Sequence, residues 1–97
     1  MVHLTLSDTA YRYYIKNTKR NANTTKEQAE LKMTRNMMLA LPYKKKRNKV
    51  WYSYGHLRFA VENNTVHWIK NNCKKHVVWY KDMEKYLKLN EELGIIQ

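Results

Sequence analysis

The sequence has few of the residues that break or cross-link a chain. Its 97 residues include two glycines, one proline and one cysteine. With so few breaks, we expect a single basic α+β domain spanning residues 1–97, with most of the chain in regular elements. The lone Cys73 cannot form an intrachain disulfide or supply a thiolate metal site by itself, so it favours a reducing, cytoplasmic setting.

Long apolar runs are also missing. No stretch approaches the roughly 20 apolar residues that span a bilayer. Residues 1–4 lack the apolar core of a signal peptide. We therefore expect neither secretion nor a membrane partner.

The motifs of familiar enzyme classes are absent. There is no glycine-rich phosphate loop and no nucleophile motif, and the acidic residues are too scattered for a two-metal nuclease. We expect no metal and no cofactor, because the four histidines show no ligand spacing: His3, His56, His67 and His76.

Positive charge is abundant and unevenly distributed. The formal net charge is +11. Residues 1–50 carry twelve Lys and Arg against three acids, whereas residues 51–97 carry seven against five. This asymmetry predicts a basic face whose partner is RNA or the ribosome, or else an acidic protein.

Two sets of cations are candidates for phosphate binding. One is a run between residues 44 and 49, and the other recurs at helical spacing near the N-terminus. A run of this kind can also be a solvated loop, but the charge asymmetry favours phosphate contact. The residues are Lys44, Lys45, Lys46, Arg47 and Lys49 in the run, and Arg12, Lys16 and Lys19 in the helical stripe.

Apolar periodicity predicts an α+β fold with the order strand, two helices, antiparallel sheet of three to four strands, and C-terminal helix. Residues 2–6 alternate as a strand. Ser7 or Asp8 offers an N-cap for the first helix, and Thr24 or Thr25 offers one for the second, which Pro42 ends. Strands follow over residues 50–69 and 76–80, with turns at 55–56 and 63–64, and a helix covers 82–93.

The predicted strands separate the aromatic residues into two groups. Register across the turn at residues 63–64 pairs Phe59 with Trp68 on the core face, which Tyr52 and Tyr54 share. The opposite face then carries Trp51, Ser53, Arg58, His67 and Ile69. Trp51 is therefore the candidate for stacking on a base.

Metal-free RNA cleavage is the enzyme chemistry that these residues allow. The substrate's own 2′-hydroxyl is the nucleophile, so the protein supplies a base, an acid and cations for the developing phosphorane. Ordinary surface polarity of a basic sheet is the other interpretation. The candidate catalytic residues are Arg58, His67, Lys75, His76 and Tyr80.

Residues 55–69, GHLRFAVENNTVHWI, resemble the central hairpin of RelE-like toxins, the ribosome-dependent mRNA interferases. The likeness continues through residues 74–76, Tyr80 and the helix around Tyr86, and the predicted element order is similar to theirs. The resemblance implies mRNA cleavage and an acidic antitoxin as partner. It also implies a role for four positions. Residues 44–49 would be the basic segment before the sheet, and Arg58 would be the arginine on the strand. Lys75 would be the cation near the C-terminal end of the site, and Tyr80 would be the active-site tyrosine.

A second function remains open at this stage. The chain can be a non-catalytic inhibitor of phage or mobile-element type, which covers an acidic or nucleic-acid-binding surface of a host protein. Sequence-specific DNA binding is least favoured, because no recognition-helix pattern stands out.

Overall fold

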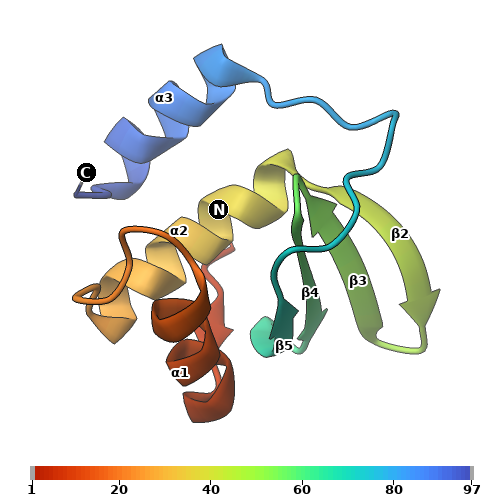
Figure 1. The fold of residues 1–97 in the computed structure, drawn as a ribbon, viewed down its shortest axis with the longest axis horizontal. Helices are drawn as coiled ribbons and strands as arrows, with labels where there is room; N and C mark the ends of the chain where they lie inside the picture. The colour runs from red at the N-terminus through yellow and green to blue at the C-terminus, as the bar shows by residue number, and fades with distance from the viewer. Residues whose placement is uncertain (1, 97) are drawn as a thin grey trace.

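The computed structural model describes residues 2–96 and confirms the α+β class (Figure 1). Three helices accompany one five-stranded sheet, so the sheet is larger than predicted. The elements are β1 (Thr5–Leu6), α1 (Asp8–Asn17), α2 (Lys26–Leu39), β2 (Leu41–Lys46), β3 (Lys49–Tyr54), β4 (Leu57–Glu62), β5 (Thr65–Lys70) and α3 (Met83–Leu93).

The sheet is mixed, with strand order β1-β5-β4-β3-β2. β2 to β5 pair antiparallel, and β1 joins β5 in parallel. The predicted strand over residues 2–6 is shorter than expected. Val2 is 51% exposed. The residues after it are hydrogen-bonded to α2: the Leu4 amide donates to Thr34 Oγ1 at 2.9 Å, and the Leu6 amide donates to Glu30 Oε2 at 2.8 Å.

The predicted helix ends are confirmed where side chains cap them. Ser7 Oγ accepts from the Ala10 amide at the start of α1, and Thr25 Oγ1 accepts from the Gln28 amide at the start of α2. Asp82 caps α3, which Gly94 ends in the left-handed conformation with φ of 70°.

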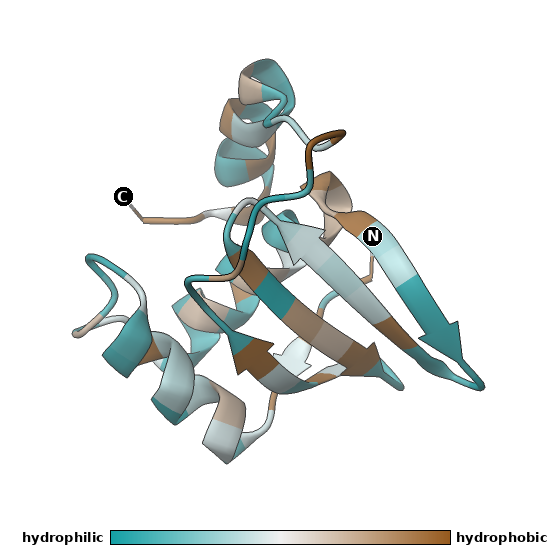
Figure 2. Cartoon of the chain, turned by 45° about the vertical axis from the view of Figure 1, so that its right-hand side comes forward, coloured by the Kyte–Doolittle hydropathy of each residue, from teal (hydrophilic) through white to brown (hydrophobic). Residues whose placement is uncertain are grey.

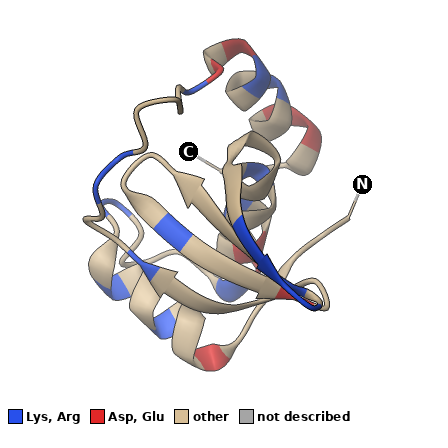
Figure 3. Ribbon diagram, turned by 90° about the vertical axis from the view of Figure 1, so that its right-hand side faces the viewer, with Lys and Arg blue, Asp and Glu red and all other residues tan. Residues whose placement is uncertain are grey.

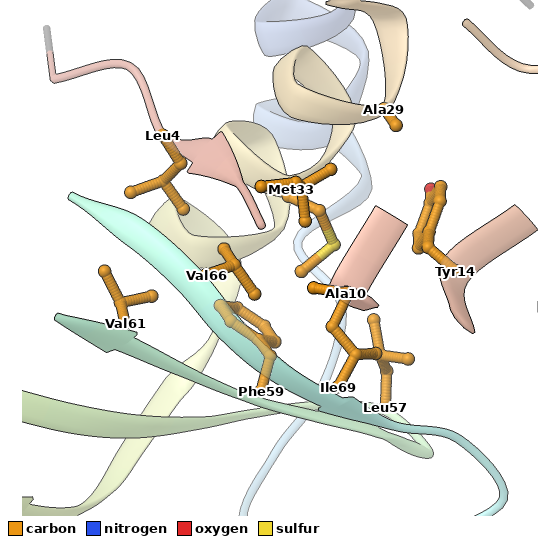
Figure 4. Packing of buried hydrophobic residues seen from close by; sticks show 11 residues of the cluster. Leu4, Ala10, Tyr14, Ala29, Met33, Leu57, Phe59, Val61, Val66 and Ile69 are labelled. Carbon is orange, nitrogen blue, oxygen red and sulfur yellow. The ribbon is translucent and has the colours of Figure 1, made fainter. Parts of the chain in front are cut away.

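The main core lies between the sheet and helices α1 and α2 (Figure 4). Phe59, Val66 and Met33 are fully buried there, and the Tyr52 ring stacks on Phe59 with centroids 5.4 Å apart. α3 packs against α2 in a second cluster that includes Leu89. In the described part of the chain, no helix covers the other face of the sheet (Figures 1 and 3).

The basic run is a strand and not a loop. α2 ends at Leu39, before Pro42, and residues 41–46 form β2 at the edge of the sheet. An edge strand tolerates proline, which has no N–H to donate, and lysines discourage further pairing at an edge. Figure 2 shows that β2 becomes hydrophilic toward its end, while the central strands carry hydrophobic residues.

The predicted pairing of Phe59 with Trp68 is wrong. Val61 does pair with Val66, but Phe59 pairs with Ile69, because His67 is an extra residue in a β-bulge. The bulge turns Trp68 outward, where it is 39% exposed, and turns Ile69 into the core.

The predicted strand over residues 76–80 is also absent. Both edges of β5 are already paired, with β4 and with β1, so no neighbouring edge is free to receive it. The segment 71–82 instead crosses the end of the sheet toward α3 (Figure 1). It is held there by bonds from the Cys73 amide to the His56 carbonyl at 2.9 Å and from Trp79 Nε1 to the Leu39 carbonyl at 3.1 Å.

Within residues 2–96, no helix combines the length and hydrophobicity that crossing a membrane requires.

Candidate nucleic-acid interface

The sheet face opposite α1 and α2, here called the outer face, gathers most of the candidate residues. Cross-strand partners share a face, so the pairing register defines its rows. Figure 3 shows a continuous Lys/Arg segment along β2 and its turn at the edge of the sheet. The rows are Leu41, Ser53, Arg58 and Lys70; Lys44, Trp51, Ala60 and Trp68; and Lys46, Lys49, Glu62 and Thr65.

Arg58 is the centre of a polar cluster on the outer face. Its Nη2 donates to the Lys74 carbonyl at 3.1 Å and lies 3.4 Å from His76 Nε2. Its guanidinium carbon is 5.4 Å from the centroid of the Tyr43 ring, which meets the His76 ring edge-on at 5.3 Å. The segment 71–82 therefore brings His76 to Arg58.

The contact with Arg58 indicates which ring nitrogen of His76 accepts a hydrogen bond. A guanidinium offers only N–H donors, so Nε2 accepts in this contact and the imidazole proton is assigned to Nδ1. Nε2 is then the ring nitrogen that faces the Arg58 guanidinium. Such an arrangement suits a group that takes a proton beside a bound phosphate.

Three buried side-chain atoms among residues 2–96 lack a hydrogen-bond partner, and all belong to this region: Ser53 Oγ, Arg58 Nε and His76 Nδ1. Ser53 pairs directly with Arg58 across β3 and β4. A buried polar atom without a partner costs roughly 1–3 kcal/mol. Their concentration at one place marks the outer face as a candidate site.

Tyr43 belongs to the cluster although sequence reasoning missed it. The register of β2 shifts between Pro42 and Lys44, so Tyr43 is an extra residue in a second bulge. Burial raises the pKa of the Tyr43 hydroxyl, and the nearby Arg58 charge opposes that rise. A proline in the strand was the one local sign of irregularity, and it does not specify where a bulge falls.

Two tryptophans flank Ala60 on the outer face. Ala60 is fully buried and pairs with Trp51 on one side and Trp68 on the other. Lys44 Nζ and Lys49 Nζ lie 4.7 and 5.0 Å from the Trp51 ring centroid. Aromatic rings beside mobile cations provide stacking surface and phosphate contacts together. Trp51 thus has the position predicted for it, and Trp68 adds a second ring.

The basic run divides between the two faces. Lys44, Lys46 and Lys49 belong to rows of the outer face. Lys45 pairs with Val50, which shares the core-side row of Val61, so Lys45 points the other way. Arg47 lies in the two-residue turn between β2 and β3, with φ of 57°.

Three of the predicted catalytic residues do not contact the cluster. His67 lies in the β5 bulge, beside Thr9 and Tyr13 of α1. Tyr80 is 79% exposed. Lys75 is exposed, with Nζ 5.9 Å from the Trp79 ring centroid. Of the five predicted catalytic residues, only Arg58 and His76 therefore lie together.

The helical stripe of cations lies apart from the basic run. Arg12, Lys16 and Lys19 are exposed on or just after α1, which covers the opposite face of the sheet. Charge in the first half of the sequence therefore forms two surfaces and not one. Only the surface that carries Lys44, Lys46 and Lys49, here called the β2 surface, adjoins the Arg58 cluster.

Among residues 2–96, no three His, Cys, Asp or Glu residues gather in a way that would hold a metal ion. No curated protein and no solved structure matches this chain. A family model does match: the YorE model aligns with residues 4–92, which is most of the sequence.

Proposed function

This chain belongs to the YorE family, a phage-type family, and we propose that it is a small RNA-binding protein that holds single-stranded RNA across the outer face of its sheet. The observation that carries the proposal is the group of buried, unpartnered polar atoms on Ser53, Arg58 and His76, next to the Trp51 ring. An RNA phosphate offers acceptors to the two donors, Arg58 Nε and His76 Nδ1.

Single-stranded RNA fits this surface better than a duplex. Unpaired bases stack on exposed rings, at about 1–3 kcal/mol per base, whereas paired bases do not expose their flat faces. Trp51 and Trp68 stand two strands apart, about 10 Å, with Ala60 between them. The lysines along β2 are placed to follow the RNA backbone.

We further propose that the Arg58 cluster cleaves RNA without a metal, in the manner of RelE-like interferases. When Arg58 turns its N–H groups from His76 to the bound phosphate, His76 Nε2 is free to take the proton of a 2′-hydroxyl, whose oxygen attacks the adjacent phosphorus. Arg58 stabilises the phosphorane charge, and the P–O5′ bond breaks as Tyr43 gives its proton to the leaving oxygen. The products are a 2′,3′-cyclic phosphate and a 5′-hydroxyl. Solvent exchange then restores the protons of Tyr43 and His76.

The test is RNA cleavage by the purified protein in EDTA, with and without ribosomes. Cyclic-phosphate ends are expected, and an RNA with 2′-deoxyribose at the cleaved position should stay intact. His76→Gln should lower the rate about 100-fold, while the exposed α3 variant Lys88→Gln should not. The absence of cleavage under both conditions would exclude the catalytic part of the proposal.

Comparing Tyr43→Phe with Tyr80→Phe decides which tyrosine acts. The family resemblance assigns the role to Tyr80, whereas contact with Arg58 favours Tyr43. A larger loss of cleavage for Tyr43→Phe is expected. A larger loss for Tyr80→Phe would support the RelE-like assignment and exclude Tyr43 as the acid.

An inhibitor that binds a host protein is the second candidate, since the family is of phage type. An apolar surface on the segment 71–82 and on α3 favours it, because exposed apolar patches mark protein interfaces. Its members are Val77, Val78, Tyr80, Met83 and Leu87, each more than half exposed. With a net charge of +11, the protein would favour an acidic partner.

Capture from a cell lysate, with and without RNase, separates the two functions. A catch of RNA and ribosomal proteins that RNase abolishes supports RNA binding. Capture of a single acidic protein after RNase treatment supports an inhibitor or an antitoxin complex, provided that the Val77→Ser/Val78→Ser variant no longer captures that protein.

A further inference from the structure

Arg35 of α2 is a buried cation without an acidic partner among residues 2–96. The residue is only 6% exposed to solvent. Nε and Nη2 donate to Asn36 Oδ1 at 3.1 and 2.9 Å, and Nη1 donates to Asn90 Oδ1 at 2.8 Å. These bonds use three of the five N–H groups of the guanidinium. The guanidinium carbon also lies 4.5 Å from the centroid of the Tyr86 ring, a cation-π contact that offsets part of the charge. Neither the neutral amides nor the ring carries a negative charge, so an anion would compensate the rest.

Two adjoining cavities meet at Arg35. The larger has a volume of about 330 Å³ and the smaller about 190 Å³, and both are lined by Arg35, Tyr14, Asn21 and Tyr86. They lie between α1, α2, the segment 71–82 and α3. Neither contains a residue of the Arg58 cluster, so this site is separate from the outer face.

The smaller cavity is lined by cations and by no acid. Lys19, Arg20 and Lys32 surround it together with Arg35. Burial lowers the pKa of Lys32, and repulsion from Arg35 lowers it further. Lys32 Nζ donates to Asn21 Oδ1 at 2.9 Å, again a neutral acceptor. Like charges held together in this way favour the entry of an anion.

The larger cavity has aromatic walls and amide side chains. Tyr54 meets Trp79 edge-on at 5.3 Å, and Tyr14 and Tyr86 complete the walls. Asn36 Nδ2, which also lines this cavity, donates only to Met33 Sδ at 3.7 Å, a weak acceptor. Flat rings and a poorly satisfied amide donor are what a nucleobase needs for stacking and edge hydrogen bonds.

We propose that the two cavities together form a nucleotide-binding site. The smaller cavity holds the phosphate through Arg35, Lys32 and Arg20, and the larger one holds the base against Tyr54, Trp79 or Tyr86. The ligand is either a free mononucleotide or the 5′-phosphorylated end of an RNA strand. Both present the same base and terminal phosphate.

Thermal unfolding with matched small ligands tests this site. AMP at about ten times its Kd should raise Tm by roughly 5–10 °C, because it binds only the folded state. Adenosine, which lacks the phosphate, and inorganic phosphate, which lacks the base, should each give a much smaller shift. An AMP shift no larger than that of inorganic phosphate would overturn the assignment to nucleotides.

Two single-charge variants provide the control. Lys32→Gln should weaken AMP binding at least tenfold, because it removes a cation that lines the phosphate cavity. Lys88→Gln, an exposed position of α3 outside both cavities, removes the same charge and should leave AMP affinity unchanged. Equal losses in the two variants, or no response to AMP at millimolar concentration in the unmodified protein, would refute the site. The variant Arg35→Lys is a further control, because it keeps the positive charge of the side chain and removes the forked N–H donors of the guanidinium.

The source of the nucleotide is decided with two RNAs of one sequence. In the Lys44→Gln/Lys46→Gln background, which weakens the outer face, tighter binding of the 5′-phosphorylated RNA than of the 5′-hydroxyl RNA assigns the site to RNA ends. Equal binding of the two RNAs, with AMP still bound, assigns it to free mononucleotides.

Discussion

At the residue scale, Ser53 shows how a site can store free energy. Its side chain is fully buried on the outer face, and Oγ has no hydrogen-bond partner in the described protein. Burying a hydroxyl without a partner costs roughly 1–3 kcal/mol. A bound ligand that supplies a partner recovers this energy, so the residue disfavours the free state more than the bound one.

Ser53→Ala is expected to stabilise the free protein by about 1 kcal/mol, since it removes the unpartnered hydroxyl and keeps the size of the side chain. Urea unfolding measures this change. RNA affinity should fall in the same variant. A loss of stability would mean that the hydroxyl is already well bonded in the free protein, which would remove part of the argument for the site.

Tyr14 gives the protein a predictable response to alkali. Burial raises its pKa from 10.0 to about 12, although Arg35 opposes the rise. The unfolded chain loses this proton near pH 10 and the folded one near pH 12. Tyr14 therefore contributes its full stability below pH 10 and loses it as the pH rises from 10 to 12.

Tyr14→Phe should reduce the alkaline loss of stability by about 2 kcal/mol near pH 12, since phenylalanine has no proton to lose. Urea unfolding of both proteins near pH 9 and above pH 11 measures the difference and cancels the titration of other groups. Identical alkaline losses would show that Tyr14 is not buried as described.

At the element scale, the sequence predicted the helix caps and turns, which depend on residues close together in the chain. The caps at Ser7, Thr25 and Asp82 and the Asn63-Asn64 turn were all readable, because side chain and backbone act within a few residues of each other. The bulges at Tyr43 and His67 were not readable. A bulge depends on packing across strands, and one extra residue moves every later side chain to the other face.

The candidate site was predictable only in part for the same reason. Arg58 and Trp51 lie between the bulges, where simple alternation holds, and both are on the predicted face. Tyr43 and Trp68 reach that face through bulges, so sequence alternation placed Trp68 in the core and overlooked Tyr43. His76 reaches Arg58 through an irregular segment whose path is set by tertiary contacts, such as that of Trp79 with the Leu39 carbonyl.

The turn between β2 and β3 carries an arginine where glycine is usual. Arg47 has φ of 57°, a left-handed conformation that costs a non-glycine residue about 1 kcal/mol. Arg47→Gly should stabilise the protein by about 0.5–1 kcal/mol and weaken RNA binding through the lost charge. Thermal unfolding of the sample measures the expected gain in stability, and RNA titration of the same sample measures the expected loss of affinity. Unchanged RNA affinity would remove Arg47 from the binding surface.

At the scale of the whole molecule, charge is separated between surfaces. The β2 surface adjoins the Arg58 cluster, whereas the stripe of Arg12, Lys16 and Lys19 lies on the helical side. One strand of RNA on the outer face should contact the first set and not the second. Because each phosphate contact releases counterions, log K should fall linearly with log salt, by about 0.7 for each contact to a single strand.

The most direct test is the salt dependence of binding to a fluorescently labelled single-stranded RNA for two variants of equal charge. Lys44→Gln/Lys46→Gln neutralises the outer face, whereas Lys45→Gln/Lys88→Gln removes two charges that point elsewhere. The first pair should weaken binding at least tenfold and reduce the salt slope by about 1.4. The second should change affinity less than about threefold. Equal losses in the two pairs, or no binding by the unmodified protein at low salt, would contradict the assignment of RNA binding to this face.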